Sequence, residues 1–466
     1  MIFCQTDFFI FFIVVWIFTW ITTNNLFRKI LLLLSSYFFY GYCDWRFCLL
    51  LFLSSLLTYL FSYKIFRFQK FSKLRKIYLI VHIFIHLFIL FIFKYYNFFI
   101  DSISSIFCIN QPSWNTSKLI LPIGISFYIF RCISYTIDIY RQKIHFYPPI
   151  LDFFLYIAFF PCLIQGPIIR ANSFLPQLQK APFFSLTSML WGIRIIVIGA
   201  FKKVFIADRI GYYVDEIFNY QFQYSSLTLV FASFAYTVQI LCDFSGYSDI
   251  AVGTSKLLGY QVINNFDSPY MSTNISDFWR RWHISLSSWL RDYLYIPLGG
   301  SRKGKFRTSL NQMITMLLGG LWHGANWNYV VWGIWHGFCL SIHKEFRSYV
   351  KSLKSSLIGK TFSWFLTMIS VVTGWIFFRA TTIKDAYLFI HRILTNKSGY
   401  LWIEPFVLFS ILILIVQNII VNNKILRKKL KPRLGTIYYW WFIFTLICLI
   451  IIFKPTKTSP FIYFQF

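Results

Sequence analysis

The segment TSLNQMITMLLGGLWHGANWNYVVWGIWHGFCLSIH (308–343) is a mainly apolar run that has basic residues at both ends, within 302–307 and 344–354. Basic residues collect in the cytoplasmic loops of membrane proteins. A single crossing would leave one basic block on the opposite side, so we expect a hairpin that enters and leaves on the same side. Each leg would have roughly 14–17 residues, or ~21–26 Å at helical rise, a little short of a ~30 Å hydrocarbon core.

The composition of the whole chain agrees with a membrane location. Of its 466 residues, 57% are hydrophobic and 13% are charged, against about 25% charged in soluble domains. Long apolar runs recur at 8–21, 47–61, 77–93, 403–420 and 437–453. They lack the alternation of barrel strands. We therefore predict an all-α, polytopic integral membrane protein of roughly 10–12 transmembrane helices plus re-entrant or interfacial helices, forming one domain over 1–466.

The formal net charge of +29 would also suit a nucleic-acid-binding protein. The basic residues, however, fall in short clusters between apolar runs, as in 64–76 and 424–433. This is the distribution of cytoplasmic loops that face anionic lipid head groups. We therefore expect membrane lipids as partners and no nucleic acid. The N-terminus, MIFCQTDFFIFF, lacks a basic region and a cleavage site, which predicts a retained first span.

The segment 277–293 precedes the hairpin and has helical spacing of its large apolar residues. Asn274 stands three residues before Asp277, which indicates an N-terminal cap. The arginines Arg280, Arg281 and Arg291 make the segment too polar for a span. We expect an interfacial or cavity-lining helix with tryptophans at the membrane boundary.

Three further stretches interrupt the apolar pattern. PCLIQGPIIR (161–170) contains two prolines and a glycine, which argues against a straight helix. AFKKVFIADRIG (200–211) joins basic and acidic residues at the end of a span. QILCDFSGYSDIAVG (239–253) carries Asp243 and Asp249, whose spacing places them on different helix faces. We therefore favour structural ion pairing over a catalytic carboxylate pair.

Three histidines lie near this unusual region: His283, His323 and His336. Ionisable residues inside a membrane are costly and usually face a polar cavity. On one continuous helix, His323 and His336 would be ~20 Å and about 220° apart, so they could meet a common substrate only if ANWN breaks the helix. His283 lies on another element and can converge with His323. A neutral structural imidazole, hydrogen-bonded between helices, is the alternative interpretation of His323.

Imidazole is a suitable general base near neutral pH, and burial keeps it neutral. His323 could accept the proton of an alcohol that attacks an acyl thioester, while His283 could hydrogen-bond the acceptor or the developing oxyanion. No GxSxG, Walker or HExxH motif occurs in the sequence. We expect no metal ligands and no bound cofactor.

SDFWRRWHISLSSWLRDYLYIPLGG (276–300) and MLLGGLWHGANWNYVVWGIWHG (316–337) closely resemble signatures of the bacterial branch of the membrane-bound O-acyltransferase family, in particular its alginate O-acetylation membrane proteins. PCLIQGPIIR, GAFKKVFIAD, QILCDFSGYSDIAVG and GWIFFRA (374–380) are similar to further signatures. The matches run in order from about residue 120 to 380.

The resemblance implies a ring of helices around a central tunnel in a bacterial cytoplasmic membrane. His323 corresponds to the family's buried catalytic histidine and His283 to its second active-site position. The resemblance implies acetyl-CoA as donor, and either a polysaccharide or a periplasmic acetyltransferase partner as acceptor. The expected supporting residues around the cavity are Trp279, Arg280, Arg281, Trp282, Trp322, Asn326, Trp327 and His336.

Two other functions stay open at this point. The same fold could acylate peptidoglycan, teichoic acid or a protein. A transporter or flippase for an anionic sugar or lipid carrier would also have many spans and a basic cavity. The lack of a visible repeat and the glycine-rich hairpin favour the acyltransferase.

Overall fold

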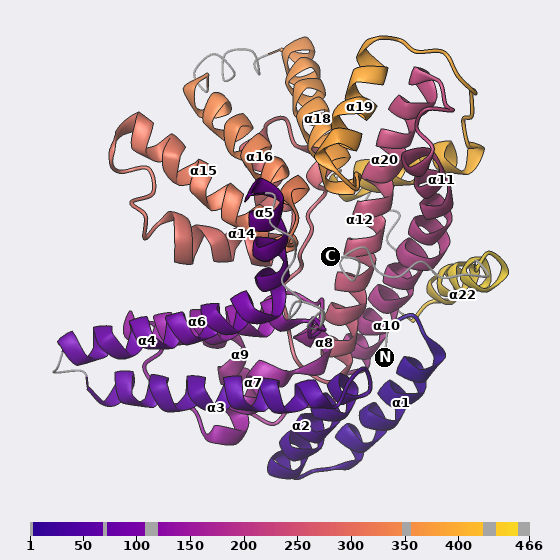
Figure 1. Ribbon diagram of the computed structural model, residues 1–466. Helices are drawn as coiled ribbons and strands as arrows, with labels where there is room; N and C mark the ends of the chain where they lie inside the picture. The colour runs from indigo at the N-terminus through magenta and orange to yellow at the C-terminus, as the bar shows by residue number, and fades with distance from the viewer. Residues whose placement is uncertain (1–2, 69–71, 108–119, 347–355, 423–434, 455–466) are drawn as a thin grey trace. The chain divides into compact units, whose positions relative to one another are not determined.

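The computed structural model describes residues 3–68, 72–107, 120–346, 356–422 and 435–454 (Figure 1). Within these ranges the regular structure is helical, and the β-structure is limited to one bridge between Tyr224 and Tyr400. The all-α prediction is confirmed. Its cause is visible in the composition, because long apolar segments in lipid must satisfy their backbone groups internally.

Within the described ranges, four helical stretches are long and apolar enough to cross a membrane: Arg46–Arg67, Lys73–Phe107, Ser226–Leu257 and Leu357–Arg379. Three shorter apolar helices accompany them, Thr6–Ile21, Pro405–Ile420 and Ile437–Ile452. The chain therefore has the helices of a polytopic membrane protein. The number of roughly 10–12 crossings stays a prediction.

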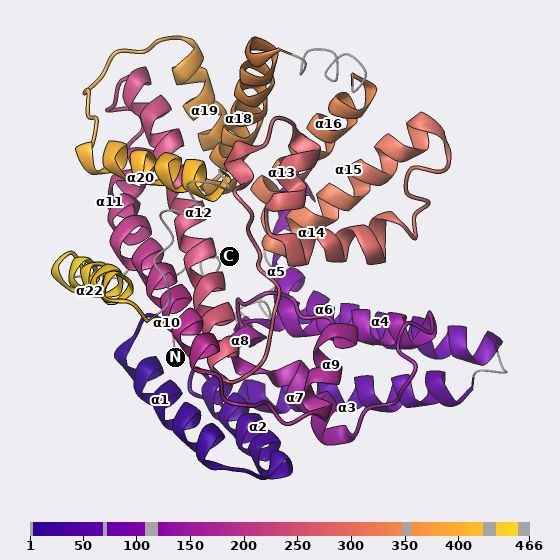
Figure 2. The ribbon, with the colours of Figure 1, turned by 180° about the vertical axis from the view of Figure 1, so that it is seen from behind.

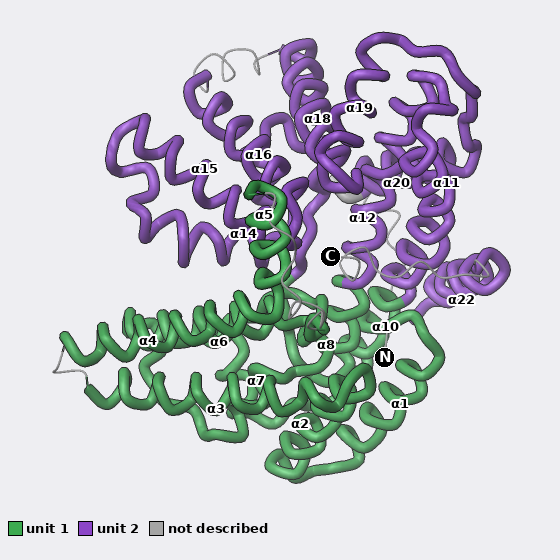
Figure 3. Tube along the Cα trace, in the orientation of Figure 1, with its two compact units in different colours: residues 1–196, 248–263 green, residues 197–247, 264–466 purple. Residues whose placement is uncertain are grey.

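The chain forms two compact units (Figure 3). Unit 1 comprises residues 1–196 and 248–263, and unit 2 comprises 197–247 and 264–466. Helix α12 (Ser226–Leu257) contributes to both units. The single domain over 1–466 stays a prediction, and each unit is described separately below.

Unit 1 contains a layer in which α3, α4 and α6 lie side by side (Figures 1 and 2). His82 and His86 of α4 are buried there, and each contacts the Thr58 hydroxyl at 3.1 Å. The helices of unit 1 are α1 (Thr6–Ile21), α2 (Asn25–Gly41), α3 (Arg46–Arg67), α4 (Ser72–Leu90), α5 (Tyr96–Phe107), α6 (Ile125–Tyr140), α7 (Ile150–Ala158), α8 (Phe160–Leu163), α9 (Ala171–Gln179) and most of α10 (Leu186–Ala200).

The PCLIQGPIIR stretch does not form a straight helix, as predicted. Helix α8 is only four residues long. The buried Arg131 guanidinium donates to the carbonyl oxygens of Ile157 and Cys162, which the irregular backbone leaves without helical partners. A Cβ atom on Gly166 would lie 2.6 Å from Cys162 Cα, so glycine permits this close approach.

Unit 2 contains the predicted hairpin of α15 (Gly304–His323) and α16 (Trp327–Glu345), which lie side by side (Figures 1 and 2). A Cβ atom on Gly333 would overlap Met316 O, so this glycine lets the legs pack closely. The legs have 20 and 19 residues and exceed the predicted 14–17, because both helices continue into the basic stretches. The other helices are α11 (Asp208–Asn219), α13 (Ile275–Arg281), α14 (Ile284–Leu290), α18 (Leu357–Arg379), α19 (Ile383–Leu394), α20 (Pro405–Asn422) and α22 (Ile437–Ile452).

The single helix predicted over 277–293 is wrong. The structure has α13, then α14, then a π-helical turn at Arg291–Tyr295. The interruption falls at His283, whose backbone is left-handed (φ 41°, ψ 56°). The spacing of apolar side chains cannot reveal a single residue whose φ and ψ angles are not helical.

The basic–acidic junction forms a buried ion-pair cluster. Lys203 lies in a π-helical turn (Phe201–Ala207), and its Nζ is 2.7 Å from Asp208 Oδ1 and 2.6 Å from Asp243 Oδ1. The prediction of structural ion pairing is confirmed for Asp243 and stays a prediction for Asp249. The cluster links the turn to α12 within unit 2.

Candidate active site

His323 is the last residue of α15, where the hairpin turns. The next residue, Gly324, is extended (φ −163°, ψ 154°), which ends the helix and separates the two legs. The imidazole is 5% exposed. Its centroid lies 5.2 Å from that of Trp322, 5.0 Å from Trp332 and 5.3 Å from Phe378, all edge-to-face.

His283 lies at the interruption between α13 and α14 and is 1% exposed. Its ring centroid is 4.6 Å from Phe244 and 6.0 Å from Trp322, both edge-to-face. Among the described residues, neither ring nitrogen of His283 has a hydrogen-bond partner. Because its ring neighbours are aromatic, this imidazole keeps a donor and an acceptor available to a ligand.

Trp322 joins the two predicted catalytic residues. Its ring contacts both His283 and His323. The structure therefore brings together two histidines that are 40 positions apart in the sequence, on the hairpin and on the preceding helical segment. Sequence spacing does not determine the distance between these histidines. In the structure, both imidazoles contact the indole of Trp322.

His336, on the second leg, lies in the same aromatic cluster. Its ring centroid is 5.1 Å from Trp279 and 5.0 Å from Trp332, and the side chain is fully buried. Trp332 thus contacts both His323 and His336. The chain does break at residues 324–326, the condition under which the sequence allows these histidines to meet, and both lie in one aromatic cluster. Neither His336 ring nitrogen has a hydrogen-bond partner in the described part of the chain.

The other predicted supporting residues divide into three groups: aromatic cluster members, a helix cap and peripheral residues. Trp279, Trp282 and Trp322 belong to the aromatic cluster, with Trp282 packed 4.8 Å from the Trp375 centroid. Asn326 caps α16 by accepting a hydrogen bond from the Asn328 amide at 2.9 Å. Its role is therefore to start the second leg.

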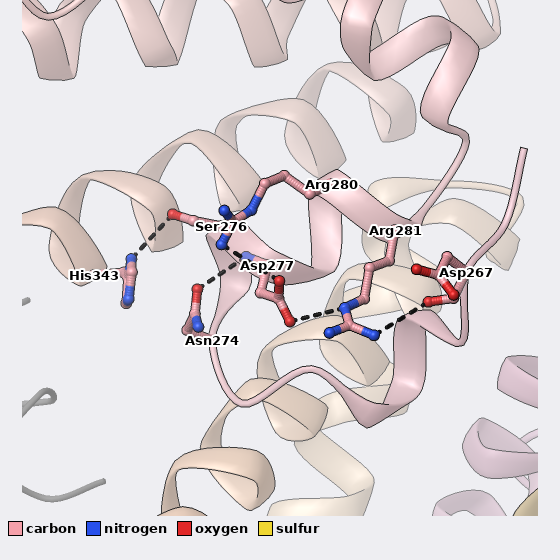
Figure 4. Close-up of polar contacts among 7 residues, drawn as sticks. All are labelled: Asp267, Asn274, Ser276, Asp277, Arg280, Arg281 and His343. Atoms are coloured by element: carbon pink, nitrogen blue, oxygen red, sulfur yellow. Dashed lines mark hydrogen bonds and ion pairs between the residues drawn. The ribbon is translucent and has the colours of Figure 1, made fainter. Parts of the chain in front are cut away.

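Trp327, Arg280 and Arg281 lie at the periphery. Trp327 is 49% exposed. Arg281 Nε donates to Asp277 at 2.9 Å, and Arg280 pairs with the same carboxylate at 3.4 Å (Figure 4). Arg281 also donates to the Asp267 carbonyl, so its guanidinium anchors the preceding loop.

The predicted cap of this segment is confirmed, and a second contact ties it to the hairpin. Asn274 Oδ1 accepts a hydrogen bond from the Asp277 amide at 2.9 Å, which begins α13 (Figure 4). Ser276 Oγ and His343 Nδ1 are 3.1 Å apart and join α13 to α16. These contacts fix the short helix that carries Trp279.

A cavity of about 290 Å³ adjoins the cluster. Trp279, which contacts His336, forms part of its wall, together with the guanidinium-bearing Arg280 and Arg291. The hydroxyls of Ser287 and Ser288 complete a polar side. Arg280 pairs with Asp277 and Arg291 Nε with Asp292 at 2.8 Å, and the remaining guanidinium N–H groups and the hydroxyls could bind an anionic ligand.

Sequence reasoning missed several contacts of these histidines. Trp332 stands four residues before His336, so helical spacing could have placed them on one face. Phe378 belongs to the GWIFFRA signature, but the sequence does not indicate its contact with His323. Phe244 packs on His283 from α12, and nothing in the sequence indicates that contact.

The chemistry available at this site is that of imidazole. A neutral imidazole has one nitrogen that can accept a proton and one that can donate a hydrogen bond. No group of three potential metal-ligating side chains, His, Cys, Asp or Glu, comes together within the described ranges. The aromatic walls would exclude water from a reacting ester or thioester.

Residues 37–378 match the membrane-bound O-acyltransferase (MBOAT) family, and the chain belongs to this family. It is therefore a membrane-bound acyltransferase, which favours the enzyme over the transporter or flippase that the sequence left open. The matched range includes the hairpin, the three histidines and the ion-pair cluster.

Relatives with assigned activities act on different acceptors. A probable alginate O-acetylase of Pseudomonas putida is 38% identical over 83% of this chain and 79% of its own length. A peptidoglycan O-acetyltransferase of Helicobacter pylori is 34% identical over 78% and 73%. A teichoic acid D-alanyltransferase of Bacillus subtilis is 29% identical over 52% and 64%.

Proposed function

We propose that this enzyme transfers acetyl groups from cytoplasmic acetyl-CoA across a bacterial cytoplasmic membrane for O-acetylation of an exported or cell-envelope polysaccharide. The observation that carries the proposal is the pair of buried histidines in contact with Trp322. The alginate O-acetylase and peptidoglycan O-acetyltransferase relatives support acetyl as the transferred group.

The proposed reaction needs one base and one hydrogen-bond donor. His323 accepts the proton of the acceptor hydroxyl as its oxygen attacks the thioester carbonyl. His283 donates a hydrogen bond to the oxyanion that forms. Collapse breaks the carbon–sulfur bond, and the departing thiolate takes the proton from His323. The products are the acetyl ester and free CoA, so atoms and charges balance.

The cavity beside Trp279 is the proposed binding site for the donor. Arg280 and Arg291 line it, and guanidinium groups bind phosphates through paired hydrogen bonds. The phosphates of CoA would bind there while the thioester reaches the aromatic cluster. The contact of Trp279 with His336 connects this cavity to the site.

The acceptor is the least specific part of the proposal. The alginate O-acetylase relatives support an alginate-like polysaccharide. The acetyl group would reach it directly or through a periplasmic acetyltransferase partner. Peptidoglycan is the second candidate acceptor, because the peptidoglycan O-acetyltransferase relative covers nearly as much of the chain.

The test is alkali-released acetate in separated envelope fractions from cells that carry the wild-type chain or His323→Ala. The matched control is His391→Ala, because His391 is an exposed histidine on α19. Protein levels are equalised by blotting. We expect His323→Ala to lose acetate from one polysaccharide fraction by at least 100-fold, the range of a lost general base, and His391→Ala to retain it.

Consumption of acetyl-CoA by the purified protein is the second readout. Loss of this activity in His323→Ala, with His391→Ala unchanged, would support the base. Unchanged acetate in every fraction from His323→Ala cells would contradict the assignment of His323.

A further inference from the structure

Unit 1 contains a cavity of about 600 Å³ that the acyl-transfer site does not use. All its lining residues belong to unit 1, where the end of α1, the segment after α9, the start of α10 and the end of α12 meet. The cationic residues of the lining are Lys180 and Lys256. The lining residues, all within the described ranges, include no aspartate or glutamate.

The walls of this cavity are held by specific contacts. The Trp20 indole donates a hydrogen bond to Leu257 O at 2.9 Å. Gln177 Oε1 accepts from the Gln261 amide at 2.8 Å, and its Nε2 donates to the Gln261 carbonyl at 3.0 Å. The cavity is therefore built before any ligand arrives, which lowers the entropic cost of binding.

Glycine is required at one point of the wall. Gly259 has a left-handed backbone (φ +90°), and a Cβ there would lie 2.5 Å from Pro182 Cβ. The close approach joins the end of α12 to the segment between α9 and α10. That segment carries Lys180 at one end and two exposed phenylalanines at the other.

The two lysines differ in their surroundings. Lys180 is exposed, whereas Lys256 is half-buried with its Nζ 5.4 Å from the Trp191 ring centroid. A half-buried lysine whose ammonium lies over an aromatic ring has less water around its head group. An anion in the cavity would gain two cationic contacts and meet no acidic side chain from the lining.

Exposed apolar side chains follow Lys180 in the chain, and Phe183 and Phe184 line the cavity. Phe183 is 84% exposed, Phe184 is 52% exposed and Leu186 is 59% exposed. The Phe184 ring also packs edge-to-face on Trp20 at 5.3 Å. Aromatic side chains next to lysines are typical of the boundary between lipid head groups and acyl chains. A soluble anion has no acyl chains that could cover the exposed phenylalanines.

We propose that this cavity binds the head group of an anionic phospholipid. The phosphate lies between Lys180 and Lys256, and the acyl chains contact Phe183, Phe184 and Leu186. This site is independent of acyl transfer, and its ligand is a resident lipid. A free phosphate compound shares the head-group chemistry but lacks the chains, so the two can be separated experimentally.

The test titrates the full-length, detergent-solubilised protein with short-chain phosphatidylglycerol, short-chain phosphatidylcholine and glycerol 3-phosphate, following binding by thermophoresis. We expect saturable binding of phosphatidylglycerol, and at least tenfold weaker binding of the other two. Lys180→Gln/Lys256→Gln should weaken phosphatidylglycerol binding by roughly 10- to 30-fold. The control Lys384→Gln/Lys397→Gln, two exposed lysines of unit 2, should bind as the wild type does.

A second variant, Ser188→Trp, fills the cavity without changing its charge, since Ser188 lines it. It should lose phosphatidylglycerol binding while its thermal unfolding midpoint stays at the wild-type value. Two results would overturn the proposal: equal binding by the Lys180/Lys256 and control variants, or glycerol 3-phosphate binding as tightly as phosphatidylglycerol. The latter would assign the cavity to a soluble phosphate ligand.

Discussion

Replacing Lys203 by methionine should destabilise the protein strongly. The lysine ammonium lies 2.7 Å from Asp208 and 2.6 Å from Asp243, and the three side chains are 5%, 2% and 3% exposed. Methionine keeps the apolar length of the side chain but removes the charge. It would leave two buried carboxylates facing one another without a cation.

The magnitude follows from the burial of the cluster. Removing one partner of a buried ion pair costs about 3–5 kcal/mol, whereas replacing all partners with neutral groups is often close to neutral. With an unfolding entropy of about 2.1 cal/mol/K per residue, a chain of 466 residues would lose roughly 3–5 °C from its unfolding midpoint. Either single Asp→Asn change leaves a neutral pair, so it should cost less.

The assay is thermal unfolding of the detergent-solubilised protein, followed by tryptophan fluorescence. Lys203→Met/Asp208→Asn/Asp243→Asn should recover most of the loss of Lys203→Met, because it removes both carboxylate charges. Lys360→Met, at an exposed position of α18, serves as the control. The reasoning fails if Lys203→Met unfolds at the wild-type temperature, or if the triple variant is as unstable as the single one.

Two further substitutions test the packing around the site. Gly374→Ala would place a Cβ 2.5 Å from His336 Nε2, and this overpacking costs about 1–3 kcal/mol against about 1 kcal/mol gained in helix propensity. We therefore expect a lower unfolding midpoint for Gly374→Ala, and recovery of the midpoint when His336→Ala is added. Equal midpoints for Gly374→Ala and the wild type would contradict the contact. Asn274→Ala removes the N-cap of α13 and should lower the free energy of unfolding by about 1 kcal/mol. Asn274→Ser should retain most of the stability, because serine also caps helices. An equal loss of stability in the serine variant would exclude capping as the cause.

The sequence predicts the elements of unit 2 better than their junctions. Basic residues at both ends of 308–343 indicate a hairpin, and the glycines that its close packing needs are visible in the sequence. The cap at Asn274 is also predicted, because capping depends on residues three positions apart. Local chemistry decides these features, so local sequence reports them.

The geometry around His283 could not be predicted in the same way. A left-handed backbone at histidine is rare, and helical periodicity continues through it. Besides its pair with Asp277 on the same helix, Arg281 donates to the Asp267 carbonyl in a preceding loop, which sequence spacing does not indicate. The contact of Phe244 with His283 joins α12 to another element of unit 2. Tertiary packing determines the His283 backbone, the loop contact of Arg281 and the Phe244–His283 contact. The residue pattern of a single sequence does not reveal such packing.

The buried histidines of the two units differ in how many of their ring nitrogens are hydrogen-bonded. A neutral imidazole has one donor and one acceptor, and leaving either unpaired in a buried site costs about 1–3 kcal/mol. In unit 1, His86 is hydrogen-bonded through both ring nitrogens and His82 through Nε2, whereas His82 Nδ1 has no partner among the described residues.

His283 and His336 meet only aromatic rings among their ring contacts, and in the described part of the chain their ring nitrogens have no hydrogen-bond partner. Aromatic side chains fix the position of an imidazole without satisfying its nitrogens. A bound polar ligand that pairs with these nitrogens would offset the cost of burying them.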